Sequence, residues 1–333
     1  MTALEKPFAI YYEHPDWFRP LFAELDRRGA NYIRLDASRH RYDPSAVETG
    51  FALLLNRMSA SAYLRGHANA IFYARDYLAH LERAGVRVVN GSDAFAIETS
   101  KARQLNLLNS LGLPFPPTRV INHPQEAPSA ARELNFPVVV KPNIGGRGAG
   151  IVRYESPAAL ARAVEAEQLD LGLDSTALVQ EFIPARGGHI TRVETLGGKY
   201  LYAIKVYPTG ESFNLCPAEI CRLEDEVSMA GEMCLADAPQ SGLRVELDDP
   251  PPEIIKAVER IAAAARLDLG GVEYFVDDRD GRLMYYDINA LSNFVADAPR
   301  IVGFDPHARL ADYLEREADK CATDTGSRFL AVG

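Results

Sequence analysis

Short apolar segments alternate with amphipathic helical segments along about the first 95 residues of the chain. The apolar run at 8–12 is followed by helical spacing over 17–30, and the amphipathic stretch 71–85 precedes a further apolar run. Strands that alternate with helices pair in parallel, because each helix carries the chain back across the sheet. The pattern therefore predicts a doubly wound α/β domain, in which ligands gather at the carboxyl ends of the strands.

The rest of the chain follows a different pattern, in which tight turns join neighbouring strands. The segment 190–208 predicts a hairpin that turns at Gly197 and Gly198, and a second hairpin that turns at Asp280 and Gly281 is predicted further on. Helices are expected at 98–112, 156–167 and 252–267. Hairpins mixed with helices indicate an α+β body.

Size and charge restrict the class of protein further. At 333 residues the chain exceeds most single hydrophobic cores, so two or three domains are expected. A net charge of −10 argues against a nucleic-acid surface, which requires clustered lysine and arginine. The four cysteines lack paired zinc spacing, the start does not resemble a signal peptide, and no apolar run is long enough to span a bilayer. These features predict a soluble, cytoplasmic protein that binds neither nucleic acid nor membrane.

A glycine-rich segment follows the buried strand expected at 136–142. Lys141 lies at the end of this strand, and four of the six residues from Gly145 to Gly150 are glycine. Glycine lets consecutive backbone N–H groups approach an anion, and a neighbouring lysine supplies positive charge. The segment lacks the ending of a Walker loop. It favours a phosphate-binding loop, and the alternative is a flexible hairpin beside an incidental lysine.

Two polar residues end the strand that is expected at 283–289. Asp287 and Asn289 are two residues apart, so their side chains share one face of the strand. A turn is the simpler explanation, because both residue types favour strand ends. Carboxylate and amide oxygens are also ligands of Mg²⁺, which takes one or two carboxylates together with phosphate oxygens. These residues alone leave both interpretations open.

Two basic residues lie at the ends of strands in the first domain. His14 follows the first expected strand and Arg57 ends the third, so both stand where a doubly wound sheet binds its ligands. An arginine at this position would bind a substrate carboxylate through two hydrogen bonds. For His14 the alternative is a solvated loop histidine.

Four motifs occur in a fixed order along the chain. They are the stretch 100–118, the glycine-rich segment 136–151, the stretch 179–184 and the hairpin that ends at Asn289. In this order they resemble the ATP-grasp superfamily over about residues 95–315, and the chain is most similar to its RimK-type amino-acid ligases.

The resemblance implies a three-part ATP-grasp fold. Residues 1–97 would form the N-terminal doubly wound α/β domain, 98–183 a linker helix with a lid subdomain, and 184–333 the C-terminal subdomain with the metal site. The two α+β subdomains would hold the nucleotide between them.

The resemblance also implies roles for the residues that match its motifs. The ATP-binding residues would be Lys101, Lys141, Gly145, Gly146, Gly148, Gln180, Glu181, Phe182, Ile183 and His189. The Mg²⁺ ligands would be Glu273, Asp287 and Asn289. The residues beside the transferring phosphoryl group and the acyl phosphate would be Arg192, Lys205 and Asn214. For Arg192 the alternative is an exposed ion pair on a surface hairpin.

The chain departs from the family pattern at three places. His189 lies where relatives commonly have an acid that holds the ribose, and the loop after Asn214 lacks the glycines of its relatives. The strand with the metal ligands continues into Ser292 and Asn293 instead of a proline and a glycine. Both residues are therefore candidate substrate contacts, although loop capping explains them equally well.

The activity implied by the resemblance is ATP-dependent ligation of a carboxylate to an amine through an acyl phosphate. It requires ATP and Mg²⁺, with two ions expected and Mn²⁺ as a substitute, and its partners are a small carboxylate and an amine or amino acid. Relatives commonly form dimers and tetramers, so this chain is also a candidate homo-oligomer. The alternatives are a small-molecule kinase on the same scaffold and a nucleotide-binding module without turnover; both lysines and the three metal-ligand positions argue against the module.

Overall fold

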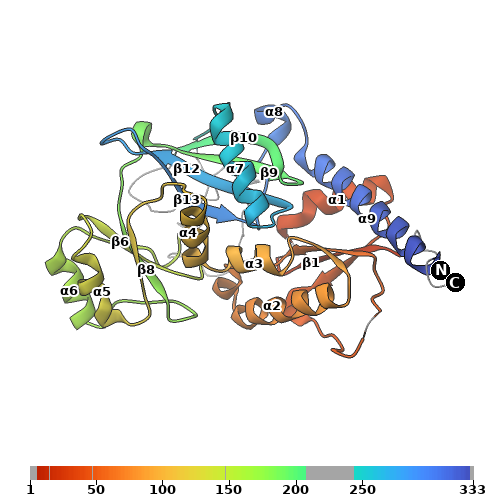
Figure 1. The fold of residues 1–333 in the computed structure, drawn as a ribbon, viewed down its shortest axis with the longest axis horizontal. Helices are drawn as coiled ribbons and strands as arrows, with labels where there is room; N and C mark the ends of the chain where they lie inside the picture. The colour runs from red at the N-terminus through yellow and green to blue at the C-terminus, as the bar shows by residue number, and fades with distance from the viewer. Residues whose placement is uncertain (1–5, 15, 47, 147, 208–243, 331–333) are drawn as a thin grey trace.

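Three β-sheets with surrounding helices make up the described part of the protein (Figure 1). The computed structural model describes residues 6–14, 16–46, 48–146, 148–207 and 244–330. The elements combine a parallel α/β sheet with two antiparallel α+β sheets, as the sequence predicts. No helix among the described residues combines the length and hydrophobicity that crossing a bilayer requires.

The first sheet is entirely parallel and has the order β2-β1-β3-β4. Its strands are β1 (Phe8–Tyr12), β2 (Tyr32–Asp36), β3 (Leu53–Arg57) and β4 (Arg87–Val89). The helices of this part are α1 (Arg19–Arg28), α2 (Ala68–Arg83) and α3 (Ser92–Glu98). α1 starts later than predicted, because Trp17 and Phe18 form a buried 3-10 turn ahead of it.

The single helix predicted at 98–112 is two helices, α3 and α4 (Lys101–Ser110). Ser100 separates them because its backbone is extended and its hydroxyl accepts the N–H of Arg103, which caps α4. Lys101 is consequently the first residue of α4 rather than part of a longer helix.

The second sheet is antiparallel with the order β5-β8-β6-β7, and we call it the lid sheet. Its elements are β5 (Thr118–Ile121), α5 (Ala127–Ala131), β6 (Val138–Pro142), β7 (Val152–Tyr154), α6 (Pro157–Glu165) and β8 (Ala177–Glu181). The sequence analysis did not predict β5. This strand lies at the edge of the sheet and its apolar residue Val120 is 51% exposed, so the strand lacks the regular alternation of apolar and polar residues that indicates a half-buried strand.

The third sheet is antiparallel with the order β11-β10-β9-β12-β13. Its strands are β9 (Ile190–Leu196), β10 (Lys199–Tyr207), β11 (Arg244–Asp248), β12 (Leu269–Val276) and β13 (Leu283–Asn289). The predicted hairpins are β9–β10 and β12–β13. One face of the sheet packs on α4 and α7 (Pro252–Ala264) through a core that includes Leu105 and Val258.

The opposite face of the third sheet belongs to a core that it shares with the first sheet and with two C-terminal helices, α8 (Ala298–Val302) and α9 (Pro306–Leu330). α9 runs beside α1 (Figure 1), where Arg28 donates to a carboxylate oxygen of Asp312 at 2.7 Å. The C-terminal helix therefore packs on the first domain, although it follows the third sheet in the chain.

Asn90 joins the first domain to the third sheet. Its side-chain oxygen accepts the backbone N–H groups of Asp268 and Leu269, and its amide nitrogen donates to the carbonyls of Leu269 and Ala290. Its backbone has φ 54°, in the left-handed region. All the hydrogen-bonding capacity of this amide is thus used between two parts of the fold.

We expect Asn90→Ala to lower the free energy of unfolding by about 3 kcal/mol, because buried backbone groups lose their partners and alanine is strained at positive φ. Glycine adopts the positive φ without strain but also lacks the amide, so we expect Asn90→Gly to lose less stability than Asn90→Ala. Denaturant unfolding of the two variants measures both contributions. Equal stability of both variants and the parent would contradict this role.

Candidate active site

The three residues predicted as metal ligands lie together on the β12–β13 hairpin. Glu273 is paired with Asp287, and Gly271 with Asn289. Residues that are opposite each other in an antiparallel pair share one face of the sheet. Asn289 donates to a carboxylate oxygen of Glu273 at 3.5 Å, and the Tyr286 hydroxyl donates to the other oxygen.

Both predicted phosphate-binding lysines converge on this hairpin. The Lys101 ammonium lies 3.5 Å from Oδ1 of Asp287. Lys141, at the end of β6, is buried, and burial together with the nearby Lys101 lowers its pKa to about 8, while Asp287 and Glu273 act in the opposite direction. Two cations from different elements therefore face two carboxylates.

The donor set fits a divalent cation such as Mg²⁺. Oδ1 of Asp287 is shielded from solvent and accepts no hydrogen bond from the described residues. Burial and the Asp287 charge raise the pKa of Glu273, because two neighbouring carboxylates repel each other. No group of three or more His, Cys, Asp or Glu side chains suited to a metal exists in the described part of the chain. Two carboxylates and one amide match an ion that takes its remaining ligands from phosphates and water.

Arg192 lies on β9, the strand next to the β12–β13 hairpin, and is paired with Glu273 of β12. Its guanidinium donates to Glu194 at 2.7 Å, to Glu273 at 3.4 Å and to the hydroxyl of Ser292. The Ser292 hydroxyl also contacts Glu194 at 2.5 Å. The side chain of Arg192 is 5% exposed, so the alternative of an exposed ion pair on a surface hairpin is wrong.

Arg57 connects the first domain to this network. Its Nη2 atom donates to the carbonyl oxygen of Ser292 at 2.7 Å and to the side-chain oxygen of Asn293 at 3.2 Å. Three of the four predicted substrate contacts are thus brought together. His14 is 2% exposed and its ring stacks on Trp17 at 4.4 Å, so the alternative of a solvated loop histidine is wrong, and its role as a substrate contact stays a prediction.

The glycine-rich loop lies against the first domain. A Cβ atom on Gly146 would lie 3.3 Å from the Cβ of Ser61, and one on Gly145 would lie 3.7 Å from the Tyr63 hydroxyl. Gly148 has φ 71°, which a residue with a side chain rarely adopts. The loop's glycines therefore allow a close approach to the segment 61–63 as well as to an anion.

The predicted adenine-binding segment ends β8. Glu181 accepts the backbone and side-chain N–H groups of Asn135 at 2.9 and 2.8 Å, so one of its oxygens already has partners within the lid sheet. The Gln180 side chain likewise donates to Thr118, at 2.7 Å. Phe182 donates its N–H to a carbonyl at Pro137 and Ile183 is buried in the core shared with the third sheet, which places this segment at the junction of the two sheets.

His189, expected near the ribose, is half-buried at the start of β9. Its ring lies 5.1 Å from that of Tyr207, and its Nδ1 atom is 3.4 Å from the carbonyl oxygen of Gly187. It stands at the same end of β9 as the adenine segment, but no contact in the structure assigns it to a ribose.

Lys205 does not join the reaction centre, which corrects the sequence prediction. It is paired with Thr191, the residue before Arg192, so its side chain projects from the opposite face of the sheet. There its ammonium contacts Asp248 at 3.1 Å. Asn214, the other residue expected near the acyl phosphate, lies outside the described residues.

Sequence reasoning missed two acidic residues that support the site. Glu194 follows Arg192 by two residues on the same strand face, a spacing that could have indicated the ion pair. Glu98 accepts the backbone N–H groups of Ala290 and Leu291 at 2.6 and 3.1 Å and thereby holds the turn after Asn289. Nothing near Glu98 in the sequence indicates this distant contact.

Comparison with known proteins finds a matching domain family and relatives of similar sequence and fold. Residues 98–213 match the RimK-like ATP-grasp domain family. A probable alpha-L-glutamate ligase of Teredinibacter turnerae is 34% identical over 139 residues, which is 41% of this chain and 45% of that protein. The chain thus spans about half the length of the curated relatives it matches.

Two solved structures cover nearly the whole chain. The ATP-grasp ligase PsnB, complexed with a phosphomimetic variant of a minimal precursor, Mg and ADP, superposes with a TM-score of 0.66 at 19% identity and covers 94% of this chain and 99% of its own. D-alanine–D-alanine ligase from Bacillus anthracis has a TM-score of 0.64 at 15% identity and covers 96% and 99%. At these identities the likeness concerns the fold.

Proposed function

We propose that the chain is an ATP-dependent carboxylate–amine ligase, because it has the ATP-grasp fold and its residues 98–213 match the RimK-like ATP-grasp domain family. The observation that carries the proposal is the convergence of Lys101 and Lys141 on the Glu273–Asp287 pair. Two cations and two carboxylates from separate elements match the charge pattern of a metal–triphosphate complex.

The proposed reaction has two steps. A carboxylate oxygen of the acid substrate attacks the γ-phosphorus of ATP, which forms an acyl phosphate and releases ADP. The nitrogen of an amine then attacks the acyl carbon, loses a proton and expels phosphate, and an amide bond results. Phosphorylation is required because a free carboxylate has no adequate leaving group.

The residues of the chain bind and orient the reactants in this scheme. Lys101 and Lys141 hold the phosphates, and the loop Gly145–Gly150 covers them with backbone N–H groups. Glu273, Asp287 and Asn289 would hold Mg²⁺, with two ions proposed, which would supply positive charge to neutralise the transferring phosphoryl group. Arg192 orients Glu273 and adds positive charge behind it.

The proposed division of labour follows the three sheets. Residues 1–97 would contribute the substrate-side arginine, residues 98–183 the lid and the adenine contacts, and residues 184–333 the metal ligands. Lys101 is connected to both sheets, because α4 packs on the third sheet and the backbone N–H of Lys101 donates to the carbonyl of Asn143, which follows β6 of the lid sheet.

The ligase activity is tested by ADP release with a panel of carboxylates, with and without amines, in the presence of hydroxylamine as a trap. We expect hydroxamate formation and an amine-dependent product. A stable phosphorylated product whose yield ignores amines would show a kinase instead and would contradict the proposal.

We expect Lys141→Met to raise the KM for ATP about 10- to 100-fold, since a buried charged contact to phosphate contributes about 1.5–3 kcal/mol. Steady-state kinetics at varied ATP measures this. Lys199→Met is the matched control, because Lys199 is exposed and pairs with Glu259 far from the hairpin. Equal KM values for the parent and Lys141→Met would remove Lys141 from the nucleotide site.

A further inference from the structure

The pairing of β12 with β13 is interrupted beside the candidate metal site. Glu273 pairs with Asp287. The next pair is Tyr274 with Tyr285, which leaves Tyr286 as an extra residue of β13 without a partner in this register. Such an insertion is a β-bulge, and β-bulges are common next to active sites, where they change the direction of a side chain.

The cores on the two faces of the third sheet show which way the bulge turns Tyr286. Tyr285 and Ile288 both belong to the core beneath α4 and α7, although regular alternation would place residues of this spacing on opposite faces. Tyr286 packs instead on the core that the third sheet shares with the first, and its ring lies 5.6 Å from that of Phe275. Tyr286 therefore lies on the same face as Glu273.

The Tyr286 hydroxyl distinguishes the two carboxylate oxygens of Glu273. It donates to Oε2 and makes no other hydrogen bond with the described residues. The other oxygen, Oε1, faces the amide nitrogen of Asn289 at 3.5 Å and the guanidinium of Arg192 at 3.4 Å, both longer than usual hydrogen bonds. Oε2 is thus held by Tyr286, whereas Oε1 is directed toward the next predicted metal ligand.

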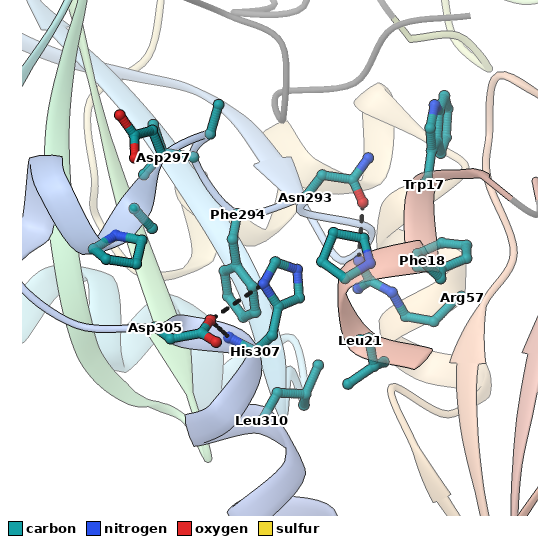
Figure 2. Close-up of a pocket in the computed structure, with 15 residues that line it drawn as sticks. Trp17, Phe18, Leu21, Arg57, Asn293, Phe294, Asp297, Asp305, His307 and Leu310 are labelled. Carbon is teal, nitrogen blue, oxygen red and sulfur yellow. Dashed lines mark hydrogen bonds and ion pairs between the residues drawn. The ribbon is translucent and has the colours of Figure 1, made fainter. Parts of the chain in front are cut away.

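Arg192 is held on its other side by a network that reaches the first domain. Its guanidinium contacts the hydroxyl of Ser292, and the carbonyl of Ser292 accepts from Arg57. Figure 2 shows the guanidinium of Arg57 beside Asn293, with which it also forms a hydrogen bond. Arg192 consequently approaches the carboxylate from the Oε1 side, and in the part of the chain that the structure describes Tyr286 is the one donor to Oε2.

A carboxylate that offers a single oxygen suits Mg²⁺ better than Ca²⁺. Mg²⁺ requires nearly ideal octahedral geometry with ligands at about 2.0–2.1 Å. Ca²⁺ accepts about six to eight oxygens at about 2.3–2.6 Å and often takes both oxygens of one carboxylate. A hydroxyl that occupies Oε2 of Glu273 therefore withholds the second oxygen from the larger ion.

We propose that Tyr286 is a positioning residue that limits Glu273 to one metal-facing oxygen and thereby determines a preference of the site for Mg²⁺ over Ca²⁺. The proposal rests on the proposed function for the metal–nucleotide complex, but it concerns binding and requires no turnover. Tyr286 touches neither the ion nor the substrate in this scheme, because it acts through Glu273.

The preference is tested by the affinity of the full chain for a nonhydrolysable ATP analogue, measured by calorimetry with either Mg²⁺ or Ca²⁺ in excess. The Kd with Ca²⁺ is divided by the Kd with Mg²⁺, and this ratio is compared between the parent and Tyr286→Phe, so that chelation by free nucleotide cancels. We expect the ratio to fall about tenfold in Tyr286→Phe, because a hydrogen bond to a charged group is lost and Glu273 can then offer both oxygens.

Tyr285→Phe is the matched control for this variant. Tyr285 precedes Tyr286 on the same strand and is 3% exposed, but its ring packs beside that of Tyr274 on the opposite face of the sheet. We expect the parental ratio from it. An unchanged ratio in Tyr286→Phe, or an equal fall in Tyr285→Phe, would overturn the proposal.

The unmodified chain provides a second test that does not depend on a variant. In crystals with the same analogue and Mn²⁺ in place of Mg²⁺, Glu273 should contact the ion through Oε1 alone while Oε2 keeps the Tyr286 hydroxyl. Coordination through both oxygens would overturn the proposal even in a chain that ligates acids. A tenfold fall of the ratio in a chain that forms neither amide nor hydroxamate would keep the role of Tyr286 and contradict the ligase function.

Discussion

Asp287→Asn is expected to lower kcat/KM for ATP turnover by about 10³-fold, because the change removes the carboxylate that faces Lys101 and the proposed metal. The asparagine has nearly the same shape, so the β12–β13 hairpin should keep its pairing. ADP release measured with saturating acid and amine gives the rate, and far-UV circular dichroism verifies the fold.

Asp278→Asn is the matched control for this variant. Asp278 lies in the connection between the same two strands, but its side chain is 60% exposed and faces Arg186. We expect parental activity from it. If Asp287→Asn retained the parental rate, the hairpin would not be the metal site.

Arg192→Met is expected to lower the free energy of unfolding by about 3–5 kcal/mol, because it leaves the carboxylate of Glu194 buried without its cation. The side chains of Arg192 and Glu194 are 5% and 1% exposed, so water cannot replace the lost partner. Chemical denaturation measures the loss. The exposed pair of Arg282 with Asp280 provides a control, since Arg282→Met should leave the unfolding midpoint unchanged.

A second substitution separates the structural role of Arg192 from its electrostatic one. In Arg192→Met/Glu194→Gln the buried negative charge is removed, and most of the stability should return. Activity should stay low, because the positive charge behind Glu273 is still missing. A double variant that regained both stability and activity would restrict Arg192 to a structural role.

The features of the candidate site's geometry that the sequence predicts correctly depend on local rules. Period-two alternation places Asp287 and Asn289 on one face, and a hairpin whose turn contains Asp280 and Gly281 returns the chain so that Glu273 faces Asp287. The parallel first sheet follows in the same way from alternating strands and helices.

The parts that the sequence does not predict depend on register and on distant contacts. Lys205 lies on the face of the sheet opposite to Arg192, because the register between β9 and β10 pairs it with Thr191. A register shift of one residue would place its side chain on the face of Arg192. The contact of Arg57 with Ser292 joins residues far apart in the chain. The packing of α9 on α1 is likewise a contact between surfaces that no local pattern specifies.

Crystals grown with Mn²⁺ and a nonhydrolysable ATP analogue test the central claim most directly, because the anomalous signal of manganese locates the ion without reference to the protein. We predict a peak within coordination distance of Glu273, Asp287 and Asn289, with the triphosphate between that ion and the ammonium groups of Lys101 and Lys141. A peak away from the β12–β13 hairpin, or a triphosphate that contacts neither lysine, would contradict the account.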